Sequence, residues 1–269
     1  MKKVVLITGI SSGFGKHTAD LLAAEGHTVY GTVRKEVDLS SGVHVLRMDL
    51  TDADSVRDTV ATVFSREKRI DVLINNAGMH TGGPAETIPD DFLMLQMETN
   101  FIGTVRITRE VLPVMRNQGG GTIINFSSIG GLMGLPFQSY YSAAKFALEG
   151  LSEALRLEVR QFNIRVVLIN PGDFRTNNTI NRRNFLAATN DADPYHAQYS
   201  ITHGIIERDE TGGMDPVKLA KRIVKIMHSR KPRLRYVIAS PDQKLSVLLK
   251  RFLPERWFMK IIGSYYRVR

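Results

Sequence analysis

The chain has 269 residues, is 43% hydrophobic, and carries a formal net charge of +9 with no cysteine. This length and composition suffice for one large core, so we expect residues 1–269 to form a single domain. Because cysteine is absent, disulfides, thiolate metal sites and cysteine nucleophiles are excluded, and the composition suits a cytoplasmic protein. No apolar run approaches the roughly eighteen residues of a membrane-spanning helix. The short run Val4–Ile7 is expected to be a first strand rather than part of a signal peptide.

Short β-branched runs alternate with longer amphipathic stretches along the chain. Several runs are apolar almost without interruption, as expected of strands that are covered on both faces. The expected strands are Lys3–Thr8, Thr28–Val33, His44–Met48, Val72–Asn75, Thr122–Phe126, Arg165–Ile169 and Arg235–Ala239. The expected helices are Phe14–Glu25, Asp54–Arg66, about Asp90–Gln118, Ser139–Gln161 and Pro216–Ser229. The alternation predicts an α/β fold, namely one doubly wound Rossmann domain with a mostly parallel seven-stranded sheet and helices on both faces.

One long stretch interrupts this alternation. Residues Asn177–Thr211 are polar and irregular, and no strand or helix is expected there. Long loops beyond the strand ends of a doubly wound fold commonly cover a ligand. We therefore expect a substrate-covering loop at about residues 177–214.

The C-terminal part is strongly basic. Between Lys218 and Arg269 there are fifteen Lys or Arg and two acids, a net charge of +13. We expect a basic segment at about 241–269 that is either simply solvated or makes weak peripheral contact with anionic lipid. Apolar residues in Leu245–Tyr266 also fit a packed terminal helix. No nucleic-acid partner is expected, because no stacking platform or base-reading motif accompanies the charge.

A glycine-rich turn directly follows the first expected strand. It reads G-x-x-x-G-x-G from Gly9 to Gly15 and leads into an expected helix. Glycines let a backbone approach a pyrophosphate closely, and a helix N-terminus favours negative charge. Glycines also mark ordinary turns, so the position between strand and helix is what indicates a dinucleotide. The expected contacts are Gly9, Ser11, Ser12, Gly13, Phe14 and Gly15.

The residues after the second expected strand bear on the choice of dinucleotide. An acid about twenty positions beyond the glycines would bind a free ribose 2′-hydroxyl, whereas an arginine would accommodate a 2′-phosphate. Arg34 stands there, which favours NADP, while Glu36 and Asp38 keep NAD open. After the third strand, Asp49 and the adjoining Leu50 are placed to meet the adenine, although Asp49 also fits the start of a helix.

Four polar residues further along suggest chemistry. Tyr141 and Lys145 are four apart on an expected helix and so share a face, with Ser128 and Asn100 upstream. Free tyrosine titrates near pH 10, and a cation about 5 Å away contributes roughly 3 kcal/mol, or about two pKa units. Lys145 could thus bring Tyr141 into the range useful for general acid–base catalysis. With the glycine turn, this set predicts hydride transfer.

The combination of motifs resembles the short-chain dehydrogenase/reductase family. The matching elements are the glycine turn, Asn76-Ala77-Gly78, Asn100, Ser128, Tyr141, Lys145 and Pro171-Gly172. The resemblance covers about residues 3 to 176 strongly and the remainder weakly. The stretches Ser127–Gly134 and Lys145–Gly150 resemble the branch that acts on hydroxysteroids and retinoids. Some NADP-preferring members have a basic residue where this chain has Ser12, which would leave most 2′-phosphate recognition to Arg34.

The resemblance implies roles for the matched residues. Lys145 would also bind the nicotinamide ribose, Ser128 would hydrogen-bond the substrate oxygen, and Asn100 would hold a water that links Lys145 to solvent. Pro171-Gly172 and Thr176 would orient the nicotinamide carboxamide. The further cofactor contacts implied are Asn76, Ala77, Gly78, Tyr141 and Phe174. A homodimer or homotetramer is implied too, paired through the helix that carries Tyr141 and the helix before it. The apolar positions that permit this pairing are Phe146, Leu148, Leu151 and Leu155.

We therefore expect an NADP(H)-dependent oxidoreductase that interconverts a ketone or aldehyde and its alcohol on a largely apolar small molecule. An NAD-linked alcohol or hydroxysteroid dehydrogenase and a catalytically silent nucleotide sensor remain alternatives. An epimerase or dehydratase has little room after Pro171 for the larger substrate lobe. Residues that either line an apolar pocket or belong to the core are Met79, Met133, Leu135, Phe137, Phe174 and Met214. No metal is expected, because His80, His196 and His203 lack a second ligand at suitable spacing.

Overall fold

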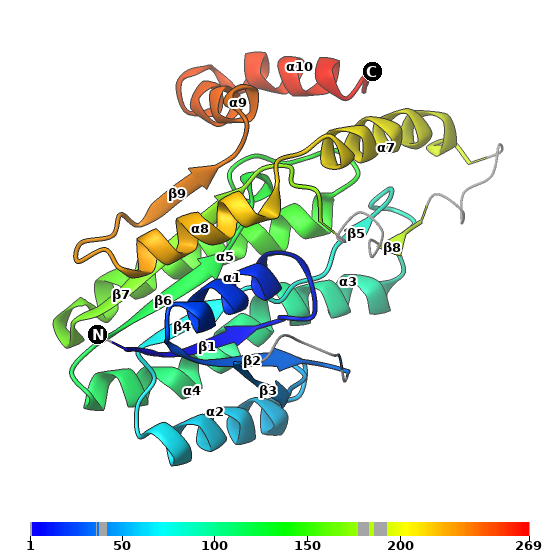
Figure 1. The fold of residues 1–269 in the computed structure, drawn as a ribbon. Helices are drawn as coiled ribbons and strands as arrows, with labels where there is room; N and C mark the ends of the chain where they lie inside the picture. The colour runs from blue at the N-terminus through cyan, green and yellow to red at the C-terminus, as the bar shows by residue number, and fades with distance from the viewer. Residues whose placement is uncertain (1, 36, 38–41, 177–182, 186–192, 269) are drawn as a thin grey trace.

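The computed structural model describes residues 2–35, 37, 42–176, 183–185 and 193–268. Its centre is a parallel sheet with the strand order β3-β2-β1-β4-β6-β7-β9 (Figure 1). The strands are β1 (Val4–Thr8), β2 (Thr28–Val33), β3 (Val43–Arg47), β4 (Val72–Asn75), β6 (Gly121–Phe126), β7 (Ile164–Pro171) and β9 (Arg235–Ile238). The predicted doubly wound fold is confirmed, and all seven expected strands are present within one or two residues.

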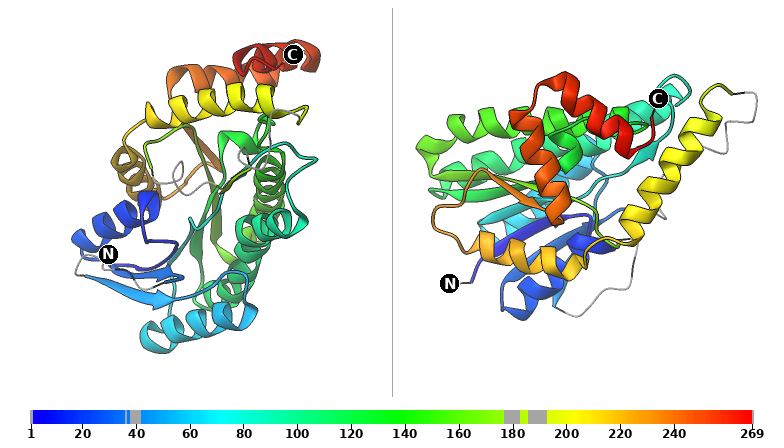
Figure 2. Two further views of the ribbon diagram at one scale, coloured as in Figure 1. Left: turned by 90° about the vertical axis from the view of Figure 1, so that its right-hand side faces the viewer. Right: turned by 90° about the horizontal axis from the view of Figure 1, so that it is seen from above.

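Helices cover both faces of the sheet (Figure 2). On one face α1 (Gly13–Ala24) packs beside α8 (Pro216–Met227). On the other lie α2 (Ala53–Glu67), α4 (Gly103–Asn117) and α5 (Ser139–Glu158). Successive β1 side chains alternate between two buried clusters, with Val5 and Ile7 facing α1 and α8, and Val4 and Leu6 facing α2 and α4. This two-sided burial explains the continuous apolar runs in the sequence.

The helix expected at about Asp90–Gln118 consists of three joined pieces. They are α3 (Asp90–Met97), a π-helical turn at Glu98–Ile102, and α4. π-turns insert one extra residue per turn and occur often at functional sites. This one contains Asn100, whose side chain is buried.

The expectation of an irregular stretch at Asn177–Thr211 is wrong for its second half. His196–Thr211 form a 16-residue helix, α7, which buries Tyr199, Thr202 and Ile206 among others. Their spacing of three and four residues is helical, but polar neighbours conceal it. Two short strands, β5 (Thr81–Gly82) and β8 (Arg183–Asn184), pair beside it. Residues 177–182 and 186–192 lie outside the described residues, so the covering role of 177–214 stays a prediction.

The basic C-terminal segment forms two helices rather than one. α9 (Pro241–Phe252) and α10 (Glu255–Tyr265) meet at Leu253-Pro254, where proline prevents a continuous helix. Phe258 and Ile262 of α10 are buried in a small cluster with Ile129 and Met133. The pair lies at one edge of the molecule beside α7 (Figures 1 and 2). Within the described part of the chain, no helix combines the length and the apolar character needed to span a bilayer.

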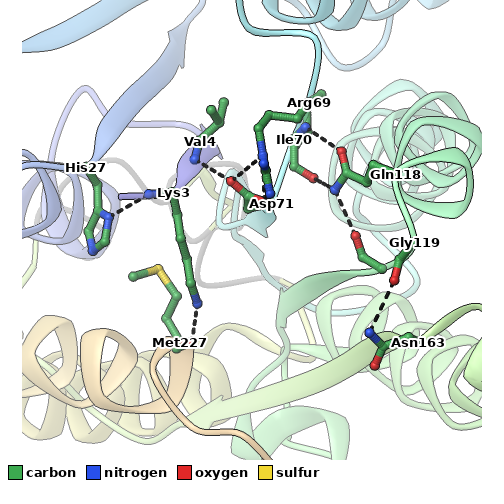
Figure 3. Close-up of polar contacts among 11 residues, drawn as sticks. Lys3, Val4, His27, Arg69, Ile70, Asp71, Gln118, Gly119, Asn163 and Met227 are labelled. Carbon is green, nitrogen blue, oxygen red and sulfur yellow. Dashed lines mark hydrogen bonds and ion pairs between the residues drawn. The ribbon is translucent and has the colours of Figure 1, made fainter. Parts of the chain in front are cut away.

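Polar contacts tie the elements together at the amino ends of the strands (Figure 3). The Val4 amide donates to Asp71 Oδ2 at 2.8 Å, which joins the starts of β1 and β4. The Gln118 side chain exchanges hydrogen bonds of 3.0 and 2.7 Å with the backbone of Ile70. Lys3 Nζ donates to the carbonyl of Met227, at the end of α8, at 2.9 Å. The contacts at the amino ends of the strands are therefore structural, and the predicted site residues lie at the opposite, carboxyl ends.

Candidate active site

A cleft of about 600 Å³ opens at the carboxyl ends of the strands. Doubly wound sheets bind ligands at this edge, and a volume of this size suits a cofactor. The predicted residues that line it are Gly9, Ser11, Ser12, Gly13, Phe14, Arg34, Asp49, Leu50, Asn76, Ala77, Gly78, Ser128, Tyr141, Lys145, Pro171, Gly172, Phe174 and Thr176. Of the sequence-predicted site residues, Gly15 and Asn100 do not line it.

The glycine turn is held in place from behind. Gly9 and Gly13 have φ values of +72° and +58°, which disfavour side chains. The Asn76 side chain donates to the carbonyls of Thr8 and Gly9 at 3.0 and 2.7 Å. A Cβ on Gly15 would collide with the Gly9 carbonyl oxygen and with Asn76 Nδ2. Gly15 therefore permits the turn, and its own contact with a cofactor stays a prediction. The turn presents bare backbone to the cleft, which fits a dinucleotide pyrophosphate.

The predicted adenosine end of the cleft is lined by two cations and one acid. Arg34 and Lys35 are exposed and both line the cleft directly after β2. Asp49 lines it after β3, with its Oδ1 accepting from the amide and the hydroxyl of Thr51, each at 2.8 Å. Asp49 therefore stabilises the turn before α2 through these hydrogen bonds and also lines the cleft. Lys35 is a lining residue that the sequence prediction passed over.

Tyr141, Lys145 and Ser128 meet at the other end of the cleft. Lys145 Nζ lies 5.7 Å from the centroid of the Tyr141 ring and donates to the Phe126 carbonyl at 2.8 Å. Ser128 Oγ accepts from the Gly130 amide at 3.0 Å, which leaves its own hydroxyl proton available for a ligand oxygen. A Cβ on Gly130 would lie 3.4 Å from both Ser128 Oγ and Tyr141 Cε1, so this glycine is close to both hydroxyl-bearing side chains.

Burial changes the proton affinity of Lys145. Removal from water lowers the pKa of Lys145 to about 8, although the Glu149 carboxylate one helical turn away opposes the shift. Glu149 is itself engaged by Asn170 and Arg235. Because this pKa lies only about one unit above neutral pH, Lys145 is still mostly charged beside Tyr141 at pH 7.

Two residues around this centre differ from expectation. Asn100 lies behind the cleft wall, where its side chain accepts from the Met79 amide and donates to the Met79 carbonyl, both at 2.8 Å. The contact fixes the loop that follows Ala77-Gly78, and the predicted water relay stays a prediction. His80 was considered only as a metal ligand, yet its ring is buried and stacks on the Tyr141 ring with centroids 4.2 Å apart. Its position directly after Asn76-Ala77-Gly78-Met79 was the available signal.

A smaller side cavity of about 70 Å³ adjoins the cleft, and Ser128 and Tyr141 line both. Its walls combine apolar side chains with three carboxylates, and no Lys or Arg among the described residues lines it. The carboxylates are Asp173, Asp209 and Glu210, and the apolar residues are Ile129, Leu135 and Ile206. The acidic side chains were not predicted, because they come from segments far apart in the sequence.

The residues proposed for an apolar pocket separate in the structure. Met79 and Phe174 line the cleft, and Leu135 lines the side cavity. The others belong to the packing: Met133 is buried beside Phe258, Phe137 packs on Tyr199, and Met214 packs on the main core.

One cluster in the described part of the chain has three groups close enough to share a metal ion. Glu25, His27 and His228 place ligand atoms within 4.8 Å of one another, away from the cleft. His27 Nδ1 accepts from the Lys3 amide at 3.1 Å. The neutral ring then carries its proton on Nε2, which faces the cluster, so His27 cannot offer that atom to a metal while this bond holds.

Comparison with known proteins agrees with this geometry. A family model described as short chain dehydrogenase matches residues 3–187. A 3-ketodihydrosphingosine reductase from Bacteroides thetaiotaomicron is 44% identical over 267 residues, which cover 99% of each chain. The 17-beta-hydroxysteroid dehydrogenase type 1 of Homo sapiens is 32% identical, with 87% of this chain and 77% of that protein covered.

Solved structures have the same fold. A short-chain dehydrogenase from Streptomyces avermitilis has a TM-score of 0.84 and 31% identity, and it covers 100% of this chain and 98% of its own. A short chain dehydrogenase from Burkholderia cenocepacia in complex with NADP has a TM-score of 0.74 and 23% identity, covering 99% and 97%. One from Burkholderia phymatum in complex with NAD has a TM-score of 0.79 and 22% identity, covering 92% of each.

Proposed function

The chain belongs to the short-chain dehydrogenase family, and we propose that it is an NADPH-dependent reductase of a ketone on a long-chain, amine-bearing amphiphile. The observation that carries the proposal is that the cleft and the side cavity share a wall. Ser128 and Tyr141 line the cleft that suits a nicotinamide dinucleotide and also the side cavity. A carbonyl held there would meet cofactor on one side and both hydroxyls on the other.

The residues supply binding and proton transfer, while the reduced nicotinamide supplies the hydride. Ser128 donates its hydroxyl proton in a hydrogen bond to the carbonyl oxygen and stabilises the charge that develops on it. As the carbonyl carbon gains hydride, Tyr141 gives its proton to that oxygen and the alcohol forms. The charge of Lys145 stabilises the tyrosinate left behind, and a proton from solvent restores the acid.

The proposed substrate class combines the resemblance with the cavity. The name of the Bacteroides relative specifies 3-ketodihydrosphingosine, in which an ammonium group stands on the carbon next to the ketone and an alkyl chain lies beyond. Carboxylates of Asp173 and Glu210, on the wall that Ser128 and Tyr141 also line, suit an ammonium, whereas Asp209 is already paired with Arg208 at 3.0 Å. The earlier expectation of a largely apolar substrate is thereby narrowed to an amphiphile.

Arg34 and Lys35 support NADP as the preferred cofactor. Both cations line the cleft immediately after β2, where a ribose 2′-phosphate would lie. Glu36 and Asp38, which kept NAD open, are outside the described residues. Related structures hold NADP in one case and NAD in another, so the proposed preference rests on Arg34 and Lys35.

The test is oxidation of NADPH and NADH by the purified protein with 3-ketodihydrosphingosine, a steroid ketone, a retinaldehyde, a quinone and a small aldehyde. Tyr141→Phe should lower kcat/KM at least about 100-fold, the usual scale for a lost general acid. Tyr140→Phe is the matched control, because Tyr140 is half-buried and its hydroxyl donates to the Ala85 carbonyl instead. Equal losses in both variants would contradict the role of Tyr141.

The same assay tests the cofactor. Arg34→Ala should raise KM for NADPH by about tenfold or more, since a charged hydrogen bond contributes roughly 1.5–3 kcal/mol, and leave KM for NADH unchanged. An unchanged preference would remove Arg34 from the proposal.

The alternative is an NAD-linked hydroxysteroid dehydrogenase, favoured by the 32% identity to the human enzyme. Faster turnover of the steroid with NADH than of the amino ketone with NADPH would establish it. Tight cofactor binding without turnover of any panel member would favour a nucleotide sensor.

A further inference from the structure

The two C-terminal helices leave a large amount of apolar surface in water. We refer to residues 241–268, which include α9 and α10, as the C-terminal arm. Phe252 is 72% exposed and Trp257 is 61% exposed. The large apolar residues exposed on the arm are Leu245, Leu248, Phe252, Trp257, Met259, Ile261 and Tyr265. A concentration of this kind marks an interaction surface rather than a random scatter of single residues.

The exposed residues follow helical spacing. Leu245, Leu248 and Phe252 stand at i, i+3 and i+7 on α9, so they share one face. Trp257, Ile261 and Tyr265 stand at i, i+4 and i+8 on α10. The neighbouring face of α10 is already used, because Phe258 and Ile262 pack into the molecule. Each helix therefore has a second apolar stripe that is largely exposed, and at the end of the α10 stripe the Tyr265 hydroxyl contacts Asp209.

Basic side chains accompany these stripes. The arm has six Lys or Arg between 241 and 268 and only two acids, Asp242 and Glu255. Lys260 Nζ lies 5.3 Å from the Trp257 ring centroid, and the Arg251 guanidinium carbon lies 5.8 Å from that of Phe252. Long cationic side chains that lie along aromatic rings can keep their charge at a polar interface while the rings enter an apolar phase.

We propose that the C-terminal arm docks on an anionic lipid bilayer surface. The apolar stripes enter the headgroup region and the cations pair with lipid phosphates. A second copy of the chain is a poorer occupant, because two faces with the same excess of positive charge repel each other. The proposal depends on the apolar and basic residues together, since either set alone has an ordinary explanation as solvated surface.

The arm also adjoins the side cavity. Tyr266, directly after α10, lines that cavity with Ser128 and Tyr141. Gln243 of α9 accepts from the Asp173 amide at 3.2 Å, and the Tyr265 hydroxyl donates to Asp209 at 2.6 Å. If the substrate is the long-chain amphiphile proposed above, a docked arm would place the cavity beside the bilayer in which that molecule dissolves. This part rests on the proposed function, whereas lipid docking does not.

The experiment is flotation of the purified full chain with vesicles of phosphatidylcholine alone or with about a third phosphatidylglycerol. We expect the wild type to float with the anionic vesicles and to remain behind with the neutral ones. Phe252→Ser/Trp257→Ser and Arg251→Glu/Arg256→Glu/Lys260→Glu should each bind at least about tenfold more weakly, since a basic residue near the surface contributes about 1 kcal/mol. Phe64→Ser/Met94→Ser is the matched control, because it removes exposed apolar side chains from α2 and α3.

Three results would overturn the proposal. They are wild-type protein that does not bind anionic vesicles, arm variants that bind as well as wild type, and a control that loses as much. Light scattering on each variant can give a fourth contrary result. If the wild type does not bind vesicles but is a dimer, and the serine variant is a monomer, the arm is an interface between two copies of the chain. Turnover of a water-soluble ketone without vesicles is measured in parallel. If the serine variant keeps its turnover but no longer floats, the result supports docking of the arm on lipid. A wild type that is inactive on every ketone would refute the proposed function, and the flotation result would still test lipid docking.

Discussion

At the scale of single residues, the buried Lys145 is expected to lower the folding stability of the protein while serving its chemistry. Its side chain is 5% exposed, and burial holds the pKa of Lys145 near 8 instead of 10.5. The unfolded chain therefore binds more protons than the folded one between those values, so this group lets stability rise with pH across that window. Below about pH 8 the buried charge costs about 3 kcal/mol. A lysine kept merely for structure would not be expected at such a cost.

Lys145→Met should separate the two roles. It should lower kcat/KM at least about 100-fold, because Tyr141 loses its neighbouring cation. Thermal unfolding without cofactor should occur at an equal or higher Tm at pH 7, since the lost bond to the Phe126 carbonyl offsets only part of the relieved burial cost. The difference in Tm from wild type should shrink between pH 8 and 10. A clearly lower Tm at pH 7 would instead make Lys145 a structural residue.

Residue identity was predictable where chemistry and spacing coincide. Tyr141, Lys145 and Ser128 were expected together and do lie together at the cleft. Asn100 was expected with them, and it bonds the Met79 backbone, a contact that the sequence did not indicate; its water relay stays a prediction. His80 was missed because its partner is a ring 61 positions away, and no local pattern reports a stacking contact of that kind.

At the scale of elements, the contact between the end of α1 and the end of α8 contains a buried histidine. His27 is 8% exposed, and burial followed by repulsion from His228 lowers the pKa of His27 below its ordinary 6.5, although Glu25 opposes the shift. The neutral ring accepts from the Lys3 amide at the start of β1. The unfolded chain binds more protons just below pH 6.5, so the stability from this contact is present above that pH and is lost as pH falls.

His27→Asn should flatten this dependence, because an amide oxygen can still accept from the Lys3 amide but does not titrate. We expect the wild type to lose more stability than the variant between pH 7 and 5, by about 1.4 kcal/mol for each unit of pKa depression. Urea unfolding at several pH values measures it. His44→Asn is the control, since His44 is exposed on β3. Parallel curves for wild type and His27→Asn would contradict the assignment.

Strands and helices could be predicted where the hydropathy pattern of the sequence was clear. The inner strands of the central sheet are buried on both faces and produce apolar runs that mark their positions. The edge strands β3 and β9 are less buried but were also expected, so all seven strands of this sheet match. α7 was missed because its buried face includes Thr202, His203 and Glu210, which no hydropathy pattern identifies as interior. The π-turn at Glu98–Ile102 leaves the helical pattern intact on both sides and was equally invisible.

At the scale of the whole molecule, the predicted homo-oligomer has less support than the helix sequence suggested. Of the apolar residues of α5 considered for an interface, Leu148 and Leu155 are buried within the chain itself. Phe146 and Leu157 remain exposed on this helix, at 45% and 74%. A homodimer or homotetramer through α5 and the helix before it therefore stays a proposal that rests on the family and on Phe146, with Leu157 as a further exposed position.

The whole fold also decides the charge of the side cavity. Asp173 follows β7, and Asp209 and Glu210 end α7, so three carboxylates gather only because the sheet edge and α7 come together. Glu210 is 8% exposed and lines both the cleft and the side cavity. A carboxylate on a wall that Tyr141 also lines would favour the ammonium of the proposed amino ketone and would disfavour anionic substrates.

Glu210→Gln should therefore change selectivity more than rate. We expect kcat/KM for 3-ketodihydrosphingosine to fall by about tenfold or more, as for loss of a charged hydrogen bond of roughly 1.5–3 kcal/mol, while kcat/KM for the matching ketone without the amine stays unchanged. Glu207→Gln is the control, because Glu207 is exposed on the same helix and pairs with His203 at 3.5 Å. Equal losses for both ketones would mean that Glu210 holds the cavity together rather than recognising the amine. Selectivity that survives in Glu210→Gln would move recognition of the amine to Asp173 or Asp209.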